Sequence, residues 1–169
     1  MAKSLDHEAR VFYESDCDLK LLQGKKVFEG RLLGGCLESL YDILTTTRYA
    51  DEKAVCEKYG IFPPREEWTG KILFVETCEE KPRPALFEKE LEALKARGVF
   101  DVVAGVIVGK PQDEAFYEEY KEIWPKTVNN DQLPIVYNVN FGHATPRCAL
   151  QYLSLIHISE PTRQAEISY

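Results

Sequence analysis

Residues 70–82 read GKILFVETCEEKP, a stretch in which an apolar strand runs directly into a carboxylate. The run 72–75 is short, continuous and apolar, which is typical of a strand that is covered on both faces. Glu76 follows where such a strand ends. Because open α/β sheets bind their ligands beyond the carboxyl ends of the strands, Glu76 is a better site candidate than a glutamate on a helix surface.

A second apolar strand, residues 135–139, leads to a histidine. It lies within PIVYNVNFGHATP and is followed by Gly142 and His143. Parallel strands of one sheet bring their carboxyl ends to the same edge. The sequence therefore predicts that Glu76 and His143 lie at one edge of the sheet. If they act as a catalytic pair, the carboxylate and the imidazole should lie within about 3 to 5 Å of each other.

Strands and amphipathic helices alternate along the rest of the chain. Further strands are expected over 26–33 and 100–108. The expected helices cover 37–44, 51–59, 84–97 and a segment around residue 120 that stops at Trp124-Pro125. This alternation predicts an α/β fold, a mixed sheet of about four strands with about four helices packed on it.

Gly34 and Gly35 are expected to form the turn between the first strand and its helix. The order of strand, double glycine and helix is also that of a phosphate-binding loop. The stretch GRLLGGCLES has neither the GxGxxG spacing nor a P-loop lysine, so a tight turn is the favoured interpretation.

Composition narrows the function classes. The chain has 169 residues, 44% hydrophobic and 29% charged, which suits one globular domain without a membrane span. A net charge of -7 argues against a nucleic-acid partner, which would need clustered lysine and arginine. The 5 cysteines form no CxxC pair, and residues 1–12 lack the apolar core of a signal peptide. A reducing, cytoplasmic location is therefore expected.

The two ends of the chain do not follow the alternating pattern. Residues 1–25 are polar and poorly periodic, so we expect an arm connecting to an N-terminal domain outside this chain. Residues 153–169 are interpreted as a tail that does not pack. Their first part, LSLIHISEPTR, is similar, letter for letter, to the translation of a transposase adapter used in sequencing libraries. His157 is therefore left out of the chemical argument.

Four stretches together resemble a known family. GRLLGGCLESL, GKILFVETCEEKP, GVIVGK and PIVYNVNFGHATPRCAL, in this order and spacing, are similar to the C-terminal domain of the LD-carboxypeptidases, which include the microcin self-immunity proteins. The resemblance covers about 27–152. It implies a two-domain serine peptidase whose N-terminal domain supplies the nucleophilic serine and the oxyanion hole.

By this resemblance, the catalytic glutamate and histidine of the family fall on Glu76 and His143. The intact enzyme would cleave an amide near the carboxyl end of a small peptide, either a murein tetrapeptide or a microcin-like peptidyl nucleotide. No metal or organic cofactor and no membrane partner is implied, and a homodimer is left open. Without the serine, this chain alone is expected to be inactive. The family's Pro-Gly continuation after the histidine strand is replaced here by Gln151 and the tail.

The residue types suit that role. A serine needs an imidazole to take its proton, and the imidazole needs a carboxylate to fix its tautomer and stabilise its charged form.

Rival interpretations remain. Glu76 with Glu79 or Glu80 resembles the acid and base pair of a glycosidase, although such carboxylates usually come from different strands. His143 with Cys148 suggests a metal or thiol site, but lacks the further ligands that zinc needs. Cys36, Cys78 and Cys148 are interpreted as small apolar side chains. A non-catalytic module that binds a small ligand in the same crevice is the alternative function.

Overall fold

The computed structural model describes residues 19–145, 147–158 and 165–166. Seven strands form one sheet in the order β1-β5-β4-β3-β2-β6-β7. They are β1 (Lys20–Gln23), β2 (Phe28–Cys36), β3 (Ile72–Glu76), β4 (Gly105–Gly109), β5 (Ile135–Val139), β6 (Leu155–Ile158) and β7 (Ala165–Glu166). Strands β2 to β5 are parallel, whereas β1, β6 and β7 are antiparallel to their neighbours. The predicted mixed α/β sheet is confirmed.

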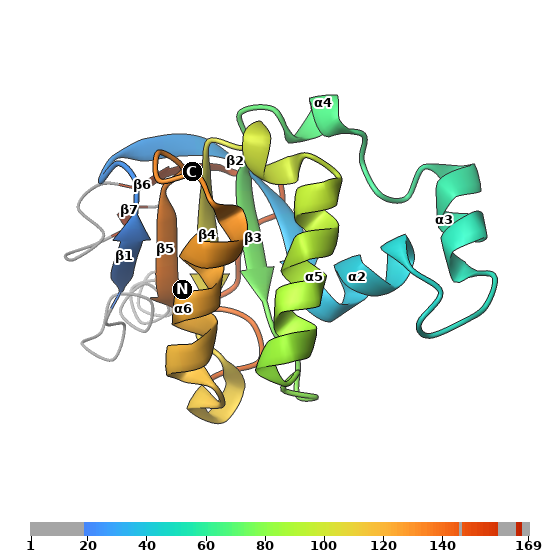
Figure 1. The fold of residues 1–169 in the computed structure, drawn as a ribbon. Coiled ribbons are helices and arrows are strands. Elements are labelled where there is room, and N and C mark those ends of the chain that lie inside the picture. Colours follow the sequence, from blue (N-terminus) through green and yellow to red (C-terminus); the bar gives the residue numbers. More distant parts are fainter. Residues whose placement is uncertain (1–18, 146, 159–164, 167–169) are drawn as a thin grey trace, which may run out of the picture.

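Helices cover one face of this sheet. They are α2 (Leu37–Leu44), α3 (Glu52–Tyr59), α4 (Arg65–Trp68), α5 (Pro84–Ala96) and α6 (Tyr117–Val128), with short 3-10 turns at Val99–Asp101 and Gln112–Glu114. Figure 1 shows α5 and α6 side by side across the sheet, with α3 standing out to one side. Among the described residues, no helix is long and apolar enough to cross a membrane.

Apolar clusters lie on both faces of the sheet. The helix-covered cluster includes Leu73, Val75, Val106, Phe87, Leu91 and Trp124. The opposite cluster includes Ile72, Ile107, Val136, Phe141 and Ile156. Successive strand residues point to opposite faces, so β3 feeds both clusters. This explains why its sequence is continuously apolar, as predicted. Each such side chain, when fully buried, contributes about 1.5 to 3 kcal/mol to folding.

Two element boundaries differ from the prediction. Strand β4 begins at Gly105 and not at Phe100, because residues 99–101 form a 3-10 turn. Helix α6 continues through Pro125 to Val128. Trp124 is fully buried, and its ring meets Phe87 and Phe100 edge-on. We infer that this burial outweighs the backbone hydrogen bond that the proline removes.

Gly34 and Gly35 do not form the predicted turn, because β2 continues through both of them to Cys36. Gly34 has a φ of +149°, and a Cβ added there would lie 2.0 Å from the backbone oxygen of Phe74. Glycine therefore allows β2 to approach β3 closely. The extended register places Cys36 directly opposite Glu76. This geometry also leaves no glycine turn to form a phosphate-binding loop.

Both ends of the chain contribute strands, so the prediction of four strands is wrong. Strand β1 lies within the expected arm and pairs with β5. Strand β6 lies within the expected tail and pairs with β2, and its Ile156 and Ile158 are each 4% exposed. The expectation of a tail that does not pack is therefore wrong for these residues. Its adapter origin stays a prediction. Residues 1–18, 159–164 and 167–169 lie outside the described part.

Candidate active site

Glu76 and His143 meet at the carboxyl end of the sheet. Glu76 is the last residue of β3, and His143 follows β5 after a short loop. The His143 Nδ1 atom lies 2.7 Å from Glu76 Oε2, a hydrogen-bond distance. The predicted proximity is thus observed, at a distance slightly shorter than the expected range. The catalytic role of the pair stays a prediction at this point.

Strand β4 lies between β3 and β5 in the sheet, so the loop after β5 must cross the end of β4 for His143 to reach Glu76. Two glycines make this crossing possible. A Cβ added to Gly109, the last residue of β4, would lie 2.8 Å from Glu76 Cβ and 2.9 Å from the Phe141 backbone oxygen. A Cβ on Gly142, whose φ is +90°, would lie 2.7 Å from Glu76 Oε2. Both positions therefore need glycine for the loop to pass over β4 and deliver His143 to Glu76.

The two side chains differ in burial, and this sets their protonation. The Glu76 side chain is 11% exposed and that of His143 is 40% exposed. Burial raises the pKa of Glu76, against the opposing effect of the hydrogen bond and charge of His143. The hydrogen bond to Glu76 raises the pKa of His143. We assign the negative charge to Glu76 and the Nδ1 proton to His143, which leaves Nε2 as the nitrogen able to accept a proton.

Glu79 contacts the other imidazole nitrogen. Its Oε2 lies 3.2 Å from His143 Nε2, and its side chain is 68% exposed. Glu76 and Glu79 thus contact opposite nitrogens of one ring. This arrangement does not support the glycosidase alternative, in which two carboxylates face each other across a sugar bond.

A shallow pocket of about 210 Å³ is lined by His143 and by the loop that follows β4. Lys110 at its wall forms an ion pair of 3.2 Å with Glu114. Asp113, Glu114 and Phe116 all have positive φ values near +54°. Backbone strain of this kind gathers at ligand sites, so the loop after β4 is a candidate for substrate contact.

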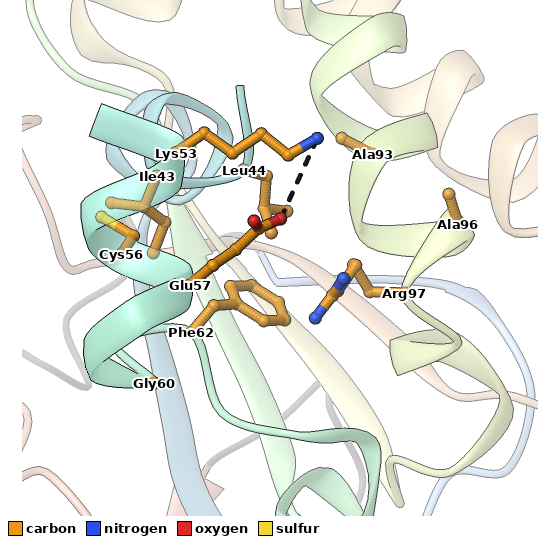
Figure 2. Close-up of a pocket in the computed structure, with 10 residues that line it drawn as sticks. All are labelled: Ile43, Leu44, Lys53, Cys56, Glu57, Gly60, Phe62, Ala93, Ala96 and Arg97. Atoms are coloured by element: carbon orange, nitrogen blue, oxygen red, sulfur yellow. Dashed lines mark ion pairs between the residues drawn. The ribbon is translucent and has the colours of Figure 1, made fainter. Parts of the chain in front are cut away.

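A second pocket, of about 330 Å³, lies between α2, α3 and α5 (Figure 2). Lys53 and Glu57 form an ion pair of 4.0 Å in its wall. The Arg97 guanidinium lies 5.5 Å from the centre of the Phe62 ring. The residues that line this pocket include neither strand-end carboxylate nor imidazole, so we place the candidate chemistry at Glu76 and His143 instead.

The structure also brings together three residues that the sequence did not connect. One ligand atom each of Cys36, Glu38 and Cys78 lies within 4.8 Å of the others. The Cys36 thiol lies 3.2 Å from Glu38 Oε2, and the Cys78 backbone N–H donates to Glu38 Oε1 at 2.9 Å. Burial raises the pKa of Cys36 to about 11 and that of Cys78 to about 12. The interpretation of these two cysteines as isolated fillers is therefore incomplete.

Cys148 fits its predicted role better. It packs against the apolar cluster on the face opposite the helices. Its backbone N–H donates to the Asn140 backbone oxygen at 2.9 Å. The described ion-pair contacts of His143 are with Glu76 and Glu79, which gives no support to a metal or thiol site formed by His143 and Cys148.

A mixed sheet that presents a carboxylate and an imidazole at its strand ends defines an α/β domain with acid–base side chains at the usual ligand edge. The family model of the LD-carboxypeptidase C-terminal domain, peptidase family S66, matches residues 29–158. The chain belongs to this family. The match extends beyond the resemblance seen in the sequence and includes β6.

Known structures agree with this assignment. An MccF-like protein from Streptococcus pneumoniae, solved in complex with AMP, is 46% identical with a TM-score of 0.85, over 91% of this chain and 45% of that chain. MccF in complex with glutamyl sulfamoyl guanosine, 22% identical over 90% of this chain and 41% of its own, shares the fold with a TM-score of 0.66.

A curated relative points to the same family. A Treponema pallidum (strain Nichols) protein named "Putative carboxypeptidase" is 32% identical over 92 residues, which are 52% of this chain and 26% of that protein. This chain therefore spans less than half the length of each of these three proteins.

Proposed function

We propose that this domain supplies the glutamate and histidine of a serine carboxypeptidase. The observation that carries the proposal is the hydrogen bond of 2.7 Å between His143 Nδ1 and Glu76 Oε2, with the His143 side chain 40% exposed. In the proposed mechanism, a serine from an N-terminal domain attacks the scissile carbonyl while His143 Nε2 takes its proton. Glu76 holds the tautomer and stabilises the imidazolium. His143 then donates the proton to the leaving amine.

In this mechanism, Glu79 is the partner of His143 Nε2 before the serine domain is in place. When His143 is protonated on both nitrogens, Nε2–H donates to this carboxylate. The exposed Glu79 side chain can turn into solvent, and Nε2 must then lose its proton before it can act as the base for the serine. An exposed ion pair of this kind contributes at most about 1 kcal/mol, so displacing it is inexpensive. Docking of the serine domain would therefore replace Glu79 at Nε2.

The proposed substrate is a small peptide whose carboxyl end carries either a nucleotide or the last residue of a murein tetrapeptide. The amide that joins this end group to the peptide is the bond that is cleaved. The 46% identity to a protein that was solved with AMP favours a peptidyl nucleotide over a murein tetrapeptide. The Lys110 side of the pocket beside His143 is where we expect the part of the substrate near the scissile amide to bind.

A chimera tests this function. The N-terminal domain of the Streptococcus pneumoniae protein would be joined in front of this chain and assayed with an aminoacyl sulfamoyl adenosine and with a murein tetrapeptide. We expect turnover of the nucleotide substrate by the chimera and none by the isolated chain. Glu76→Gln should lower kcat by up to about four orders of magnitude, because the tautomer is no longer controlled. A folded chimera that keeps its full rate with Glu76→Gln would overturn the assignment, and binding without turnover would favour the non-catalytic module.

A further inference from the structure

We propose that Cys36, Glu38 and Cys78 form a binding site for a divalent cation of borderline softness, with Zn²⁺ as the expected ion. The proposal does not rest on the carboxypeptidase function. It concerns residues on the ends of β2 and β3 and at the start of α2, beside the Glu76 and His143 pair but separate from it.

The geometry is close to that of a bound ion. The two sulfur atoms and one carboxylate oxygen lie within 4.8 Å of one another. Around tetrahedral zinc, with Zn–S bonds of about 2.3 Å, two sulfur ligands stand about 3.8 Å apart. Small side-chain rotations would therefore convert the observed cluster into a three-ligand site, with the fourth position left for water.

The fold holds these ligands in place. Cys36 ends β2 in register with Glu76, and Cys78 follows Glu76 by two residues. Glu38 lies in the first turn of α2 and accepts the Cys78 N–H at 2.9 Å. All three ligands thus come from the ends of packed elements, where their positions are set by the sheet and not by a long loop.

The surroundings favour a positive charge. Besides the effect of burial, the charge of Glu38 raises the pKa of Glu90 and of Tyr120. Glu90 is only 2% exposed, and its Oε2 has no hydrogen-bond partner among the described residues. A cation at the cluster would offset the charge of Glu38 that acts on these neighbours.

The ligand set determines which cation fits. Binding would release the two thiol protons to solvent. The resulting two thiolates with one carboxylate suit Zn²⁺ or Co²⁺, whereas Mg²⁺ and Ca²⁺ prefer sites made only of oxygen. Bound metal would also tie the end of β2 to the segment that follows β3. We therefore expect it to stabilise this edge of the sheet, including the strand end that carries Glu76.

A cobalt titration of the full, reduced, metal-free chain tests the proposal. We expect one equivalent of Co²⁺ to produce a near-ultraviolet sulfur-to-cobalt charge-transfer band, which Zn²⁺ removes and Mg²⁺ does not. Cys36→Ser and Cys78→Ser should each weaken Co²⁺ binding at least 100-fold. Glu38→Gln should weaken it about 10-fold. Cys56→Ser is the matched control, because Cys56 is a free cysteine in α3 outside the cluster, and it should leave binding unchanged.

The rate of cysteine alkylation in the unaltered chain is a second test, which does not depend on whether the variants fold. With Zn²⁺ present, alkylation of Cys36 and Cys78 should slow at least 10-fold, while that of Cys148 stays the same. Cobalt binding without the charge-transfer band, or without loss in both cysteine variants, would overturn the proposal. So would binding that is lost with His143→Ala instead, because it would place the ion at the Glu76, His143 and Glu79 cluster.

Discussion

Two side-chain clusters share the end of β3, and they differ in how their charges are balanced. Glu76 faces an imidazole that hydrogen-bonds to it, so a basic group offsets the buried carboxylate. Two residues further on, Cys78 faces Glu38 and Cys36, and this cluster contains no basic group. The comparison shows that one strand end carries a paired acid–base site and, beside it, a cluster of two thiols and a carboxylate, for which we have proposed a cation as ligand.

The largest expected effect is a loss of kcat, which should differ between variants of two histidines of similar exposure. His143 is 40% exposed and contacts Glu76, whereas His157 is 46% exposed and contacts Glu29 at 3.4 Å. In the active chimera, His143→Ala should lower kcat by at least about three orders of magnitude, because the serine loses its base. His157→Ala should leave kcat within about twofold. The measurement is steady-state hydrolysis of the aminoacyl sulfamoyl adenosine. Equal losses in the two variants would mean that the paired site is not the catalytic one.

The next effect tests the close approach of β2 to β3, on which the Cys36 cluster depends. Gly34 and Gly35 have similar φ values, +149° and +154°, but only Gly34 would place a Cβ against Phe74, at 2.0 Å. Gly34→Ala should destabilise the chain by at least about 3 kcal/mol, through strain and strand separation. Gly35→Ala, which has open space, should cost about 1 kcal/mol. Urea unfolding measures both, and equal costs would show that the strand contact is unimportant.

The two clusters also differ in how far the sequence predicts them. Glu76 and His143 each follow a short apolar run, and the alternation of strands and helices puts both runs in one parallel sheet. Their proximity could therefore be predicted. Their direct contact also depends on Gly109 and Gly142, which admit the loop across β4 and carry no signal that distinguishes them from ordinary turn glycines.

The Cys36 cluster could not be predicted in this way. Two consecutive glycines usually interrupt a strand, so Gly34-Gly35 indicated a turn. Only the register shows that β2 continues and sets Cys36 opposite Glu76. Strand β6 was missed for another reason. Ile156 and Ile158 alternate with exposed residues as in a half-buried strand, but the similarity of this segment to an adapter translation predicts a tail that does not pack.

A smaller effect concerns Glu90, which lies in the acidic neighbourhood of the Cys36 cluster. Burial, then the charges of Glu38, Asp42 and Glu80, raise its pKa from 4.5 to about 8. Since the folded pKa is the higher one, the unfolded chain releases this proton first. Stability should therefore fall as pH rises between these two values, by at most about 1.4 kcal/mol per pH unit.

Glu90→Gln keeps the shape of the side chain and removes this titration. We expect the variant to gain about 1 to 2 kcal/mol over the wild type between pH 6 and pH 8, with no further gain at higher pH. Urea unfolding at several pH values measures the difference. A difference that does not change with pH would show that Glu90 is paired or hydrated, and would weaken the case for an unbalanced acidic region.

The smallest effect concerns the paired site. The hydrogen bond to Glu76 is the largest cause that raises the pKa of His143, and the charge of Glu79 adds a lesser contribution. NMR titration should therefore show a lower His143 pKa in Glu76→Gln and a smaller decrease in Glu79→Gln. Because the folded pKa is raised, the associated stability is fully present below the unfolded value, about 6.5, and is lost as pH rises through the folded pKa. With His143 40% exposed, we expect less than about 1 kcal/mol. Equal decreases in the two variants would mean that His143 senses the general charge of the strand end, and the contrast between a paired and an unbalanced cluster would then lose its electrostatic basis.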